Sequence, residues 1–200
     1  MRPALRCCTL LLAAALAGCA LAPAAEAPLT HSLIDQLPDD LPRRAPSSST
    51  LLVYPPEARP AVDTLQMAYA PQPHQLAYYA RNQWAETPPQ MLQPLLVQSL
   101  AATGAFAAVV TPPHTPGGTL GLRTEITDLV QDFTQEPPVL RLTLRVRLSD
   151  ERTQKVLGAR DITQREPMQQ KAPGAGVAAA NAAMARALRE IAQFVLEKTP

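Results

Sequence analysis

The most regular pattern in this 200-residue chain is the alternation of side chains between Leu140 and Ser149. Every second residue is leucine or valine, and the residues between them are arginine, threonine or serine. Successive side chains of a strand point to opposite faces, so this strand has one apolar face and one polar face. The pattern predicts an antiparallel sheet that buries one face and leaves the other in water.

The residues around this strand predict its neighbours. Apolar and polar residues also alternate from Leu120 to Val130, and Val156 to Gln164 return as a strand after a polar turn. A final helix is predicted from Ala175 to Glu197, because its apolar residues recur at helical spacing. We expect this helix to cover one face of the sheet. Asn181 falls on its apolar stripe, and we expect it in the frayed first turns.

The first half of the chain is interrupted by prolines and predicts shorter elements. A helix is expected from Thr87 to Thr103, with Gly104 as the residue that ends it. Four strands are predicted, and they are Leu51 to Tyr54, Leu65 to Tyr69, His74 to Tyr79 and Phe106 to Val110. The second and third of these are expected to pair as a hairpin, and the fourth is expected to be buried. A further strand between Thr30 and Leu37 is left open.

The N-terminal residues have the pattern of an export signal. Arg2 and Arg6 precede an apolar run from Leu10 to Leu16, which is shorter than the roughly 20 residues that a spanning helix needs. The run ends in Leu16-Ala17-Gly18-Cys19, which is typical of a bacterial lipoprotein signal. We expect cleavage before Cys19, a diacylglycerol thioether and an N-acyl chain such as palmitate on this residue, and no other cofactor. The alternative is a plain secretory signal with an accidental cysteine.

The residues after the signal predict where the protein lies. Ala20 stands where an aspartate would favour retention at the inner membrane, so we expect the periplasmic face of the outer membrane. Residues 19–48 contain five prolines and predict an extended tether behind the lipidated cysteine. The predicted organisation is therefore a signal peptide over residues 1–18, the tether over 19–48 and one folded domain over 49–200.

No catalytic or metal-binding motif is visible. His31, His74 and His114 are far apart in the chain, and no acidic pair flanks them at metal-ligand spacing. The chain has 18 basic and 17 acidic residues, which is not the concentrated positive charge of a nucleic-acid-binding protein. We expect no enzymatic activity, no metal and no nucleic acid partner.

The arginines at positions 141, 145 and 147 share the polar face of one predicted strand. One interpretation is a surface that binds lipid headgroups or carboxylates of a partner. The other is a solvated sheet face on which arginines lie across from Glu125 and Asp161, and we favour this second interpretation.

Three of the eight aromatic residues of the chain lie close together, just before the first predicted helix. Tyr78, Tyr79 and Trp84 are large amphipathic side chains of the kind that anchor interfaces, and Arg81 lies among them. Aromatic residues that lead into a helix also pack in the core. Both interpretations stay open, and these four residues are the candidate partner-binding site.

The order of these features resembles one protein family, the ABC-type transport auxiliary lipoproteins, which include the paraquat-inducible protein C type. The resemblance extends over roughly residues 49–197. Many members have a tyrosine-containing strand soon after the lipidated cysteine, and Thr30-His31-Ser32-Leu33 departs from this pattern. The matching features are the lipoprotein box, the strand with Leu51, Val53, Pro55 and Pro56, the segment with Tyr78, Tyr79, Arg81 and Trp84, the turn Thr103-Gly104-Ala105-Phe106, and the alanine-rich last helix.

The resemblance implies an α/β fold, more closely an α+β sandwich in which two main helices cover a mixed, mainly antiparallel sheet. It also implies an auxiliary component of a transport system for phospholipid or other hydrophobic molecules. The implied partners are an MCE-domain (mammalian cell entry) protein, its ABC permease and outer-membrane lipid, while formation of a homo-oligomer is left open. Two other functions also stay open: a structural lipoprotein of another envelope machine, and a periplasmic hydrolase with an unrecognised site.

Overall fold

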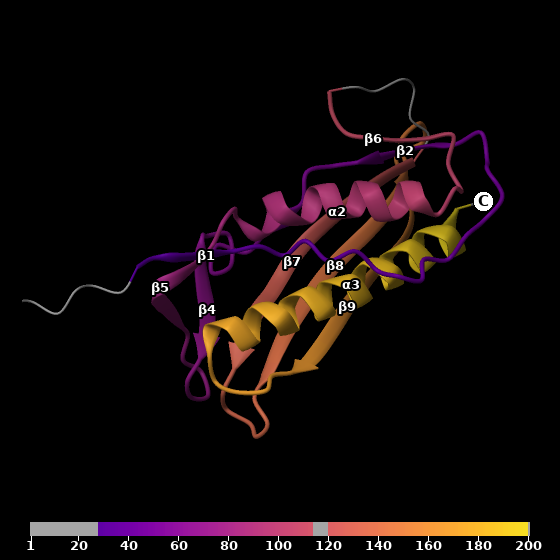
Figure 1. Cartoon of the computed structure of the whole chain (residues 1–200). Coiled ribbons are helices and arrows are strands. Elements are labelled where there is room, and N and C mark those ends of the chain that lie inside the picture. The colour runs from indigo at the N-terminus through magenta and orange to yellow at the C-terminus, as the bar shows by residue number, and fades with distance from the viewer. Residues whose placement is uncertain (1–27, 114–119, 200) are drawn as a thin grey trace, which may run out of the picture.

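The computed structural model describes residues 28–113 and 120–199, so the predicted signal peptide, Cys19 and His114 lie outside the described residues. Nine strands and two long helices follow one another in this part of the chain (Figure 1). In order they are β1 (Thr30–Ser32), β2 (Thr50–Val53), β3 (Glu57–Ala58), β4 (Gln66–Ala70), β5 (Ala77–Trp84), α2 (Pro88–Ala102), β6 (Ala108–Val110), β7 (Leu120–Asp132), β8 (Val139–Asp150), β9 (Lys155–Pro167) and α3 (Pro173–Lys198).

Strand β7 is the centre of the sheet. One edge of β7 pairs antiparallel with β8 from Leu120 to Asp132, and β8 pairs antiparallel with β9. The other edge is shared by the short strands β2, β3 and β4, which each pair in parallel with a different part of β7. Strand β6 pairs with the other edge of β2. Strand β5 pairs with the other edge of β4, and β1 in turn pairs with β5. The prediction of a mixed, mainly antiparallel sheet with two helices is confirmed.

Both helices lie on the same face of the sheet (Figure 1). Helix α2 begins after Thr87, whose backbone N–H donates to Oε1 of Gln90 at 3.0 Å, as in a capping box. Its last turn is followed by Gly104 with φ +69°, a conformation that costs glycine little. The predicted limits of this helix are confirmed.

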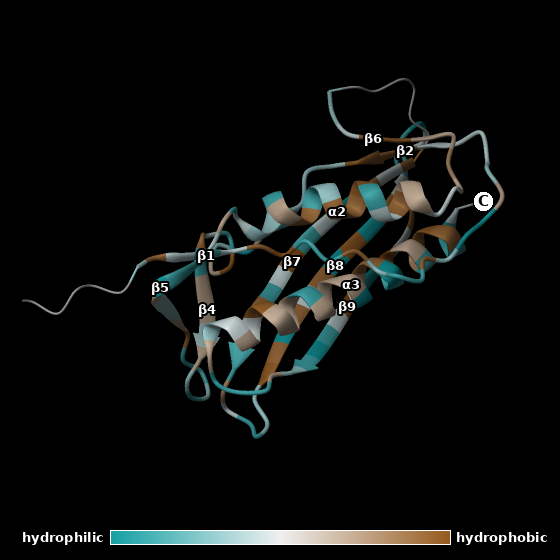
Figure 2. Cartoon of the chain, viewed as in Figure 1, coloured by the Kyte–Doolittle hydropathy of each residue, from teal (hydrophilic) through white to brown (hydrophobic). Residues whose placement is uncertain are grey.

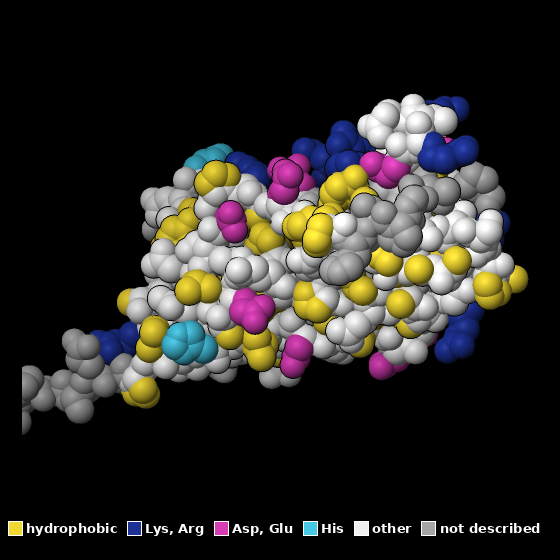
Figure 3. Space-filling view, turned by 90° about the horizontal axis from the view of Figure 1, so that it is seen from above, with side chains coloured by type: hydrophobic (Ala, Val, Ile, Leu, Met, Phe, Trp, Pro, Cys, Tyr) yellow, Lys and Arg dark blue, Asp and Glu magenta, His cyan; other side chains and the backbone are white. Residues whose placement is uncertain are grey.

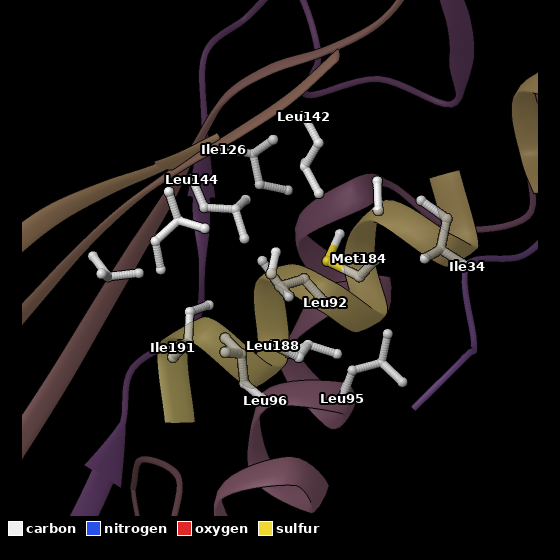
Figure 4. Close-up of a cluster of buried hydrophobic side chains, with 14 of the residues drawn as sticks. Ile34, Leu92, Leu95, Leu96, Ile126, Leu142, Leu144, Met184, Leu188 and Ile191 are labelled. Carbon is white, nitrogen blue, oxygen red and sulfur yellow. The ribbon is translucent and has the colours of Figure 1, made fainter. Parts of the chain in front are cut away.

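The core lies between the sheet and the two helices (Figures 2 and 4). The alternating leucines of β8 point into it, and Leu142 and Leu144 are fully buried. Leu188 of α3 and Leu92 of α2 meet them from the helical layer. Complete burial of such a side chain contributes about 1.5–3 kcal/mol, so this layer is the main source of stability.

Two predicted strands differ from the structure. The third was expected to start at His74, which instead lies in a turn with φ 63°, and β5 runs from Ala77 to Trp84. The fourth is shorter than predicted and is half-buried, because β2 is the one described strand that pairs with β6. The predicted antiparallel hairpin of β4 and β5 is confirmed.

The described part of the expected tether is folded onto the domain. Strand β1 pairs in parallel with the last three residues of β5, so the first strand that was left open exists. Ile34 is only 2% exposed, and Leu41 packs against the same core. The expectation of an extended tether as far as residue 48 is therefore wrong for residues 30–48, because the apolar residues among its prolines fit the helical layer.

Candidate functional site

The four residues of the candidate partner-binding site lie on β5, where they have different environments. Trp84 is 3% exposed and belongs to the core, so it is not available to a partner. The hydroxyl of Tyr78 donates to the carbonyl oxygen of Ala61 at 3.0 Å, and this side chain is half-buried. Arg81 is exposed. Of the four residues, only Arg81 is thus exposed, and the tryptophan is used for packing.

Tyr79 belongs to an aromatic cluster that joins β4, β5 and the end of β7. Its ring centroid is 4.7 Å from that of Tyr69, which is 5.6 Å from that of Phe133. Burial raises the pKa of Tyr79 to about 12, so the phenol is neutral at physiological pH. Its hydroxyl donates to Oε1 of Gln131 at 3.0 Å. We assign Tyr79 to packing.

Gln131 connects this cluster to the start of α3. The side chain is 1% exposed, and its Nε2 has no hydrogen-bond partner within the described chain. A Cβ at Gly176 would lie 2.1 Å from the Gln131 side chain, so only glycine lets the helix approach this closely. Neither residue was predicted as part of a site, because neither belongs to a local pattern in the sequence.

Residues 33–47 form a strap that crosses the helical layer and fixes the path of the N-terminal segment. The Asn181 side chain accepts the backbone N–H groups of Asp35 and Gln36 at 3.0 and 3.1 Å and donates to the carbonyl oxygen of Leu33. Asn181 is therefore a clamp for the strap, and the expectation that it lies in the frayed first turns of the helix is wrong. Its place on an otherwise apolar stripe was the signal in the sequence.

The far end of the strap is held by an arginine. Nη1 of Arg44 donates to the carbonyl oxygens of Leu196 and Thr199 at 3.0 and 3.1 Å, at the C-terminus of α3. A cation is favourable at this end of a helix because the last carbonyl groups are unpaired and carry partial negative charge. The strap is thus attached along the length of α3.

The open face of the sheet, which lies opposite the helices, carries the row of arginines. Arg145 bridges Glu125 at 3.3 Å and Asp161 at 3.0 Å. Arg123 pairs with Glu151 at 2.9 Å and stacks 3.8 Å from the ring centroid of Tyr54. Basic and acidic side chains accordingly lie next to one another along one margin of the molecule (Figure 3). The predicted pairing of arginines with Glu125 and Asp161 is confirmed for Arg145.

Two open pockets lie on this face. The larger, of about 600 Å³, is lined by Tyr54 with Pro55 and Pro56 and by three arginines, among them Arg147. Arg147 lies opposite Arg123 in the sheet and is exposed. The acidic Glu57 and Glu125 line the same pocket, so its charge is close to balanced.

The second pocket, of about 510 Å³, lies beside the β4–β5 turn and contains His74, Asp128 and Asp132. Arg141 bonds both carboxylates, at 3.1 and 3.2 Å. Burial raises the pKa of Asp128 despite that arginine. Burial also acts to raise the pKa of Asp132, but hydrogen bonds from Thr134 and Gln135 and the arginine charge outweigh it and hold the pKa below its usual value. This arrangement is a structural ion-pair network.

Residues 28–113 and 120–199 contain no group of three histidines, cysteines or acidic residues that could hold a metal ion. Neither helix of this described part has the length and apolar character that a membrane span requires.

Solved structures show that the fold is shared. A protein from Xanthomonas campestris with the family model DUF330 has a TM-score of 0.72 at 22% identity, over 86% of this chain and 96% of that one. An uncharacterized protein matches with a TM-score of 0.69 at 14% identity, over 84% and 99% of the two chains. The hypothetical protein CT253 from Chlamydia trachomatis has a TM-score of 0.52 at 10% identity, over 74% and 96%.

A search of curated proteins found no match. The family model for the ABC-type transport auxiliary lipoprotein component matches residues 32–192. That range includes the strap, the whole sheet from β2 to β9, and most of α3. The chain therefore belongs to the ABC-type transport auxiliary lipoprotein family.

Proposed function

We propose that this protein is a lipoprotein of the outer membrane, anchored by Cys19 and facing the periplasm, that serves an MCE-type ABC transport system. Its cargo would be phospholipid or another hydrophobic molecule, and its role would be to dock the periplasmic MCE assembly at the outer membrane. The observation that carries the proposal is the family match over residues 32–192. The lipoprotein box before Cys19 supports it independently.

The strap supports a short connection to the membrane. Only ten residues, 20–29, separate Cys19 from β1. At about 3.3–3.6 Å per residue they reach at most about 35 Å. The β1–β5 side of the domain would then lie close to the lipid, because β1 is fixed to β5 and the strap to α3.

This side also offers a surface for docking. Strand β1 covers the outer edge of β5 only at Asn82 to Trp84, so the outer edge of residues 77–80 has no partner strand in the described chain. Tyr78 lies within this edge, and Arg81 follows it directly. An edge strand with an aromatic and a cationic side chain suits an extended peptide of a partner.

Cell fractionation tests the anchor. We expect Cys19→Ala to move the protein from the outer-membrane fraction into the soluble periplasm, because anchoring depends on burial of acyl chains at about 0.8 kcal/mol per CH₂. Retention of Cys19→Ala in the outer membrane would contradict the proposed anchor.

Capture of the MCE-domain protein from the same bacterium tests docking. We expect the double variant Tyr78→Ala, Arg81→Glu to recover much less of it than the unchanged lipoprotein. Its melting temperature should fall somewhat, because Tyr78→Ala also removes the hydrogen bond to Ala61, and the capture is read at a temperature at which the variant is folded. The control is Arg152→Glu, an exposed change in the β8–β9 turn at the other end of the molecule (Figure 1). Equal recovery by all three proteins would argue against docking at β5.

A further inference from the structure

Strand β9 has a long free edge. It pairs only with β8, and no other described strand lies on its outer side (Figure 1). It has 13 residues, whereas the edge strands β1 and β6 have three each. A free edge presents a row of unpaired backbone N–H and C=O groups, which is a template for another strand.

The charged residues of this edge are arranged symmetrically in the sequence. Asp161 and Arg165 lie two residues on either side of Thr163, and Arg160 and Glu166 lie three residues on either side. Each of these pairs combines opposite charges. When two copies of β9 pair antiparallel about a twofold axis at Thr163, Asp161 of each copy lies directly opposite Arg165 of the other, and Arg160 lies opposite Glu166.

The adjacent registers, with the axis at Ile162 or Gln164, place no opposite charges directly across from each other, and registers further away bring like charges together. A twofold axis at Asp161 puts two copies of this carboxylate opposite each other, and an axis at Arg160 does the same with two guanidinium groups. Like charges directly opposite in a sheet are unfavourable. Arg165 is exposed, and it has no ion-pair partner among the described residues of its own chain. The register at Thr163 supplies Asp161 of the other copy, a carboxylate that also bonds Arg145 of its own chain at 3.0 Å and would be shared by the two arginines. Arg160 and Glu166 have partners in their own chain, Glu197 and Arg186, so Arg165 is the one charge of the four that the contact newly pairs.

We propose that two copies of this chain associate through β9, antiparallel and with the twofold axis at Thr163. The axis runs perpendicular to the sheet, so the dimer has one continuous sheet with the helices of both copies on the same side. Such an interface is isologous, because the same surface of each copy makes it. This inference goes beyond the transport role and does not depend on it.

Disulfide trapping in the full-length protein tests the contact. The three cysteines of the chain are Cys7, Cys8 and Cys19, so the described part contains none. Directly opposite residues of antiparallel strands have Cα atoms about 4.5–5.5 Å apart, which suits a disulfide. We expect Thr163→Cys to give a covalent dimer on non-reducing gels after mild oxidation of intact cells.

The control is Thr153→Cys, which is exposed in the β8–β9 turn, away from the axis. We expect this variant to stay monomeric under the same conditions. Absence of a Thr163→Cys dimer, or an equal yield from Thr153→Cys, would overturn the proposal.

Charge reversal tests the register. In the Thr163→Cys background, Asp161→Arg alone and Arg165→Asp alone should each lower the rate of dimer formation by about tenfold, because each creates like charges across the axis twice. The double change Asp161→Arg, Arg165→Asp restores opposite charges and should restore the rate. A double variant that crosslinks no faster than the single variants would show that the register is wrong, and melting temperatures confirm that each variant is folded.

Discussion

The two faces of the sheet use the same strands for different purposes. Leu144 and Arg145 are consecutive residues of β8, yet the leucine is fully buried under the helices and the arginine is exposed on the open face. The helical face depends on close packing. The open face depends on ion pairs, and such pairs at a surface contribute little to the free energy of unfolding.

This difference separates stability from interaction. The apolar face holds the sheet and helices together, so its residues cannot change without cost. The open face is a network in which Arg123, Arg141 and Arg145 each meet at least one carboxylate. The net charge of the open face is therefore close to zero. The surfaces most open to partners are then the strand edges at β5 and β9.

The largest expected effect is on the helical face. Leu144→Ala should lower the free energy of unfolding by about 2–5 kcal/mol, because the cavity left between β8 and the helices cannot close fully. Chemical denaturation of the purified domain measures this. A loss below about 1 kcal/mol, within the range of an ordinary surface change, would contradict the assignment of this face as the core.

The strap is a second layer on the helical face. Asn181→Ala should cost about 1–3 kcal/mol, because it removes three hydrogen bonds to the backbone of the strap. Hydrogen exchange should become faster in residues 33–37 before it does in the sheet. The control is Arg189→Ala, whose ion pair with Asp40 is exposed on both sides. Equal exchange in both variants would argue against the clamp.

Asp132 is a buried carboxylate on the otherwise solvated open face. It makes the free energy of unfolding depend on pH in the acidic range. Its pKa is lower in the folded chain than its usual value, so its contribution is present above pH about 4 and is lost as the pH falls through the folded-state pKa. We expect Asp132→Asn to be less stable than the unchanged chain at pH 7. The difference in melting temperature between Asp132→Asn and the unchanged chain should shrink as the pH falls from 5 to the lowest pH at which the chain folds. A difference that stays constant over this range would show that it does not come from the charge of Asp132.

The smallest effect is expected at Arg145. Arg145→Ala should change the melting temperature far less than Leu144→Ala, because both of its ion pairs are largely exposed and are screened by salt. Thermal unfolding at low and high salt measures both quantities. A loss comparable to that of Leu144→Ala would remove the distinction between the two faces.

The elements predicted most accurately are those with local patterns. The alternation in β8 and the helical spacing in α3 give their type and burial, because one face of each is repeatedly apolar. The parallel pairing of β2, β3 and β4 along a single edge of β7 was not predicted, since pairing partners distant in the chain leave no periodic signal. The strap was missed because its prolines suggested an extended chain.

The candidate site was predicted as a segment, and its residues were separated only by the structure. Tyr78, Tyr79 and Trp84 look alike in the sequence, but β5 directs them to a carbonyl group, an aromatic cluster and the core respectively. The direction of a side chain depends on register and twist, which the residue type does not encode.

The amino-acid sequence by itself determined the alternating strands, both helices and the family, because these depend on local periodicity and on the order of short motifs. Only the tertiary structure decided that the strap lies along α3, that Trp84 is inside and that β9 has no second partner strand among the described residues. The physical reason is that these features depend on which distant residues meet, and such contacts form only when the whole core is assembled.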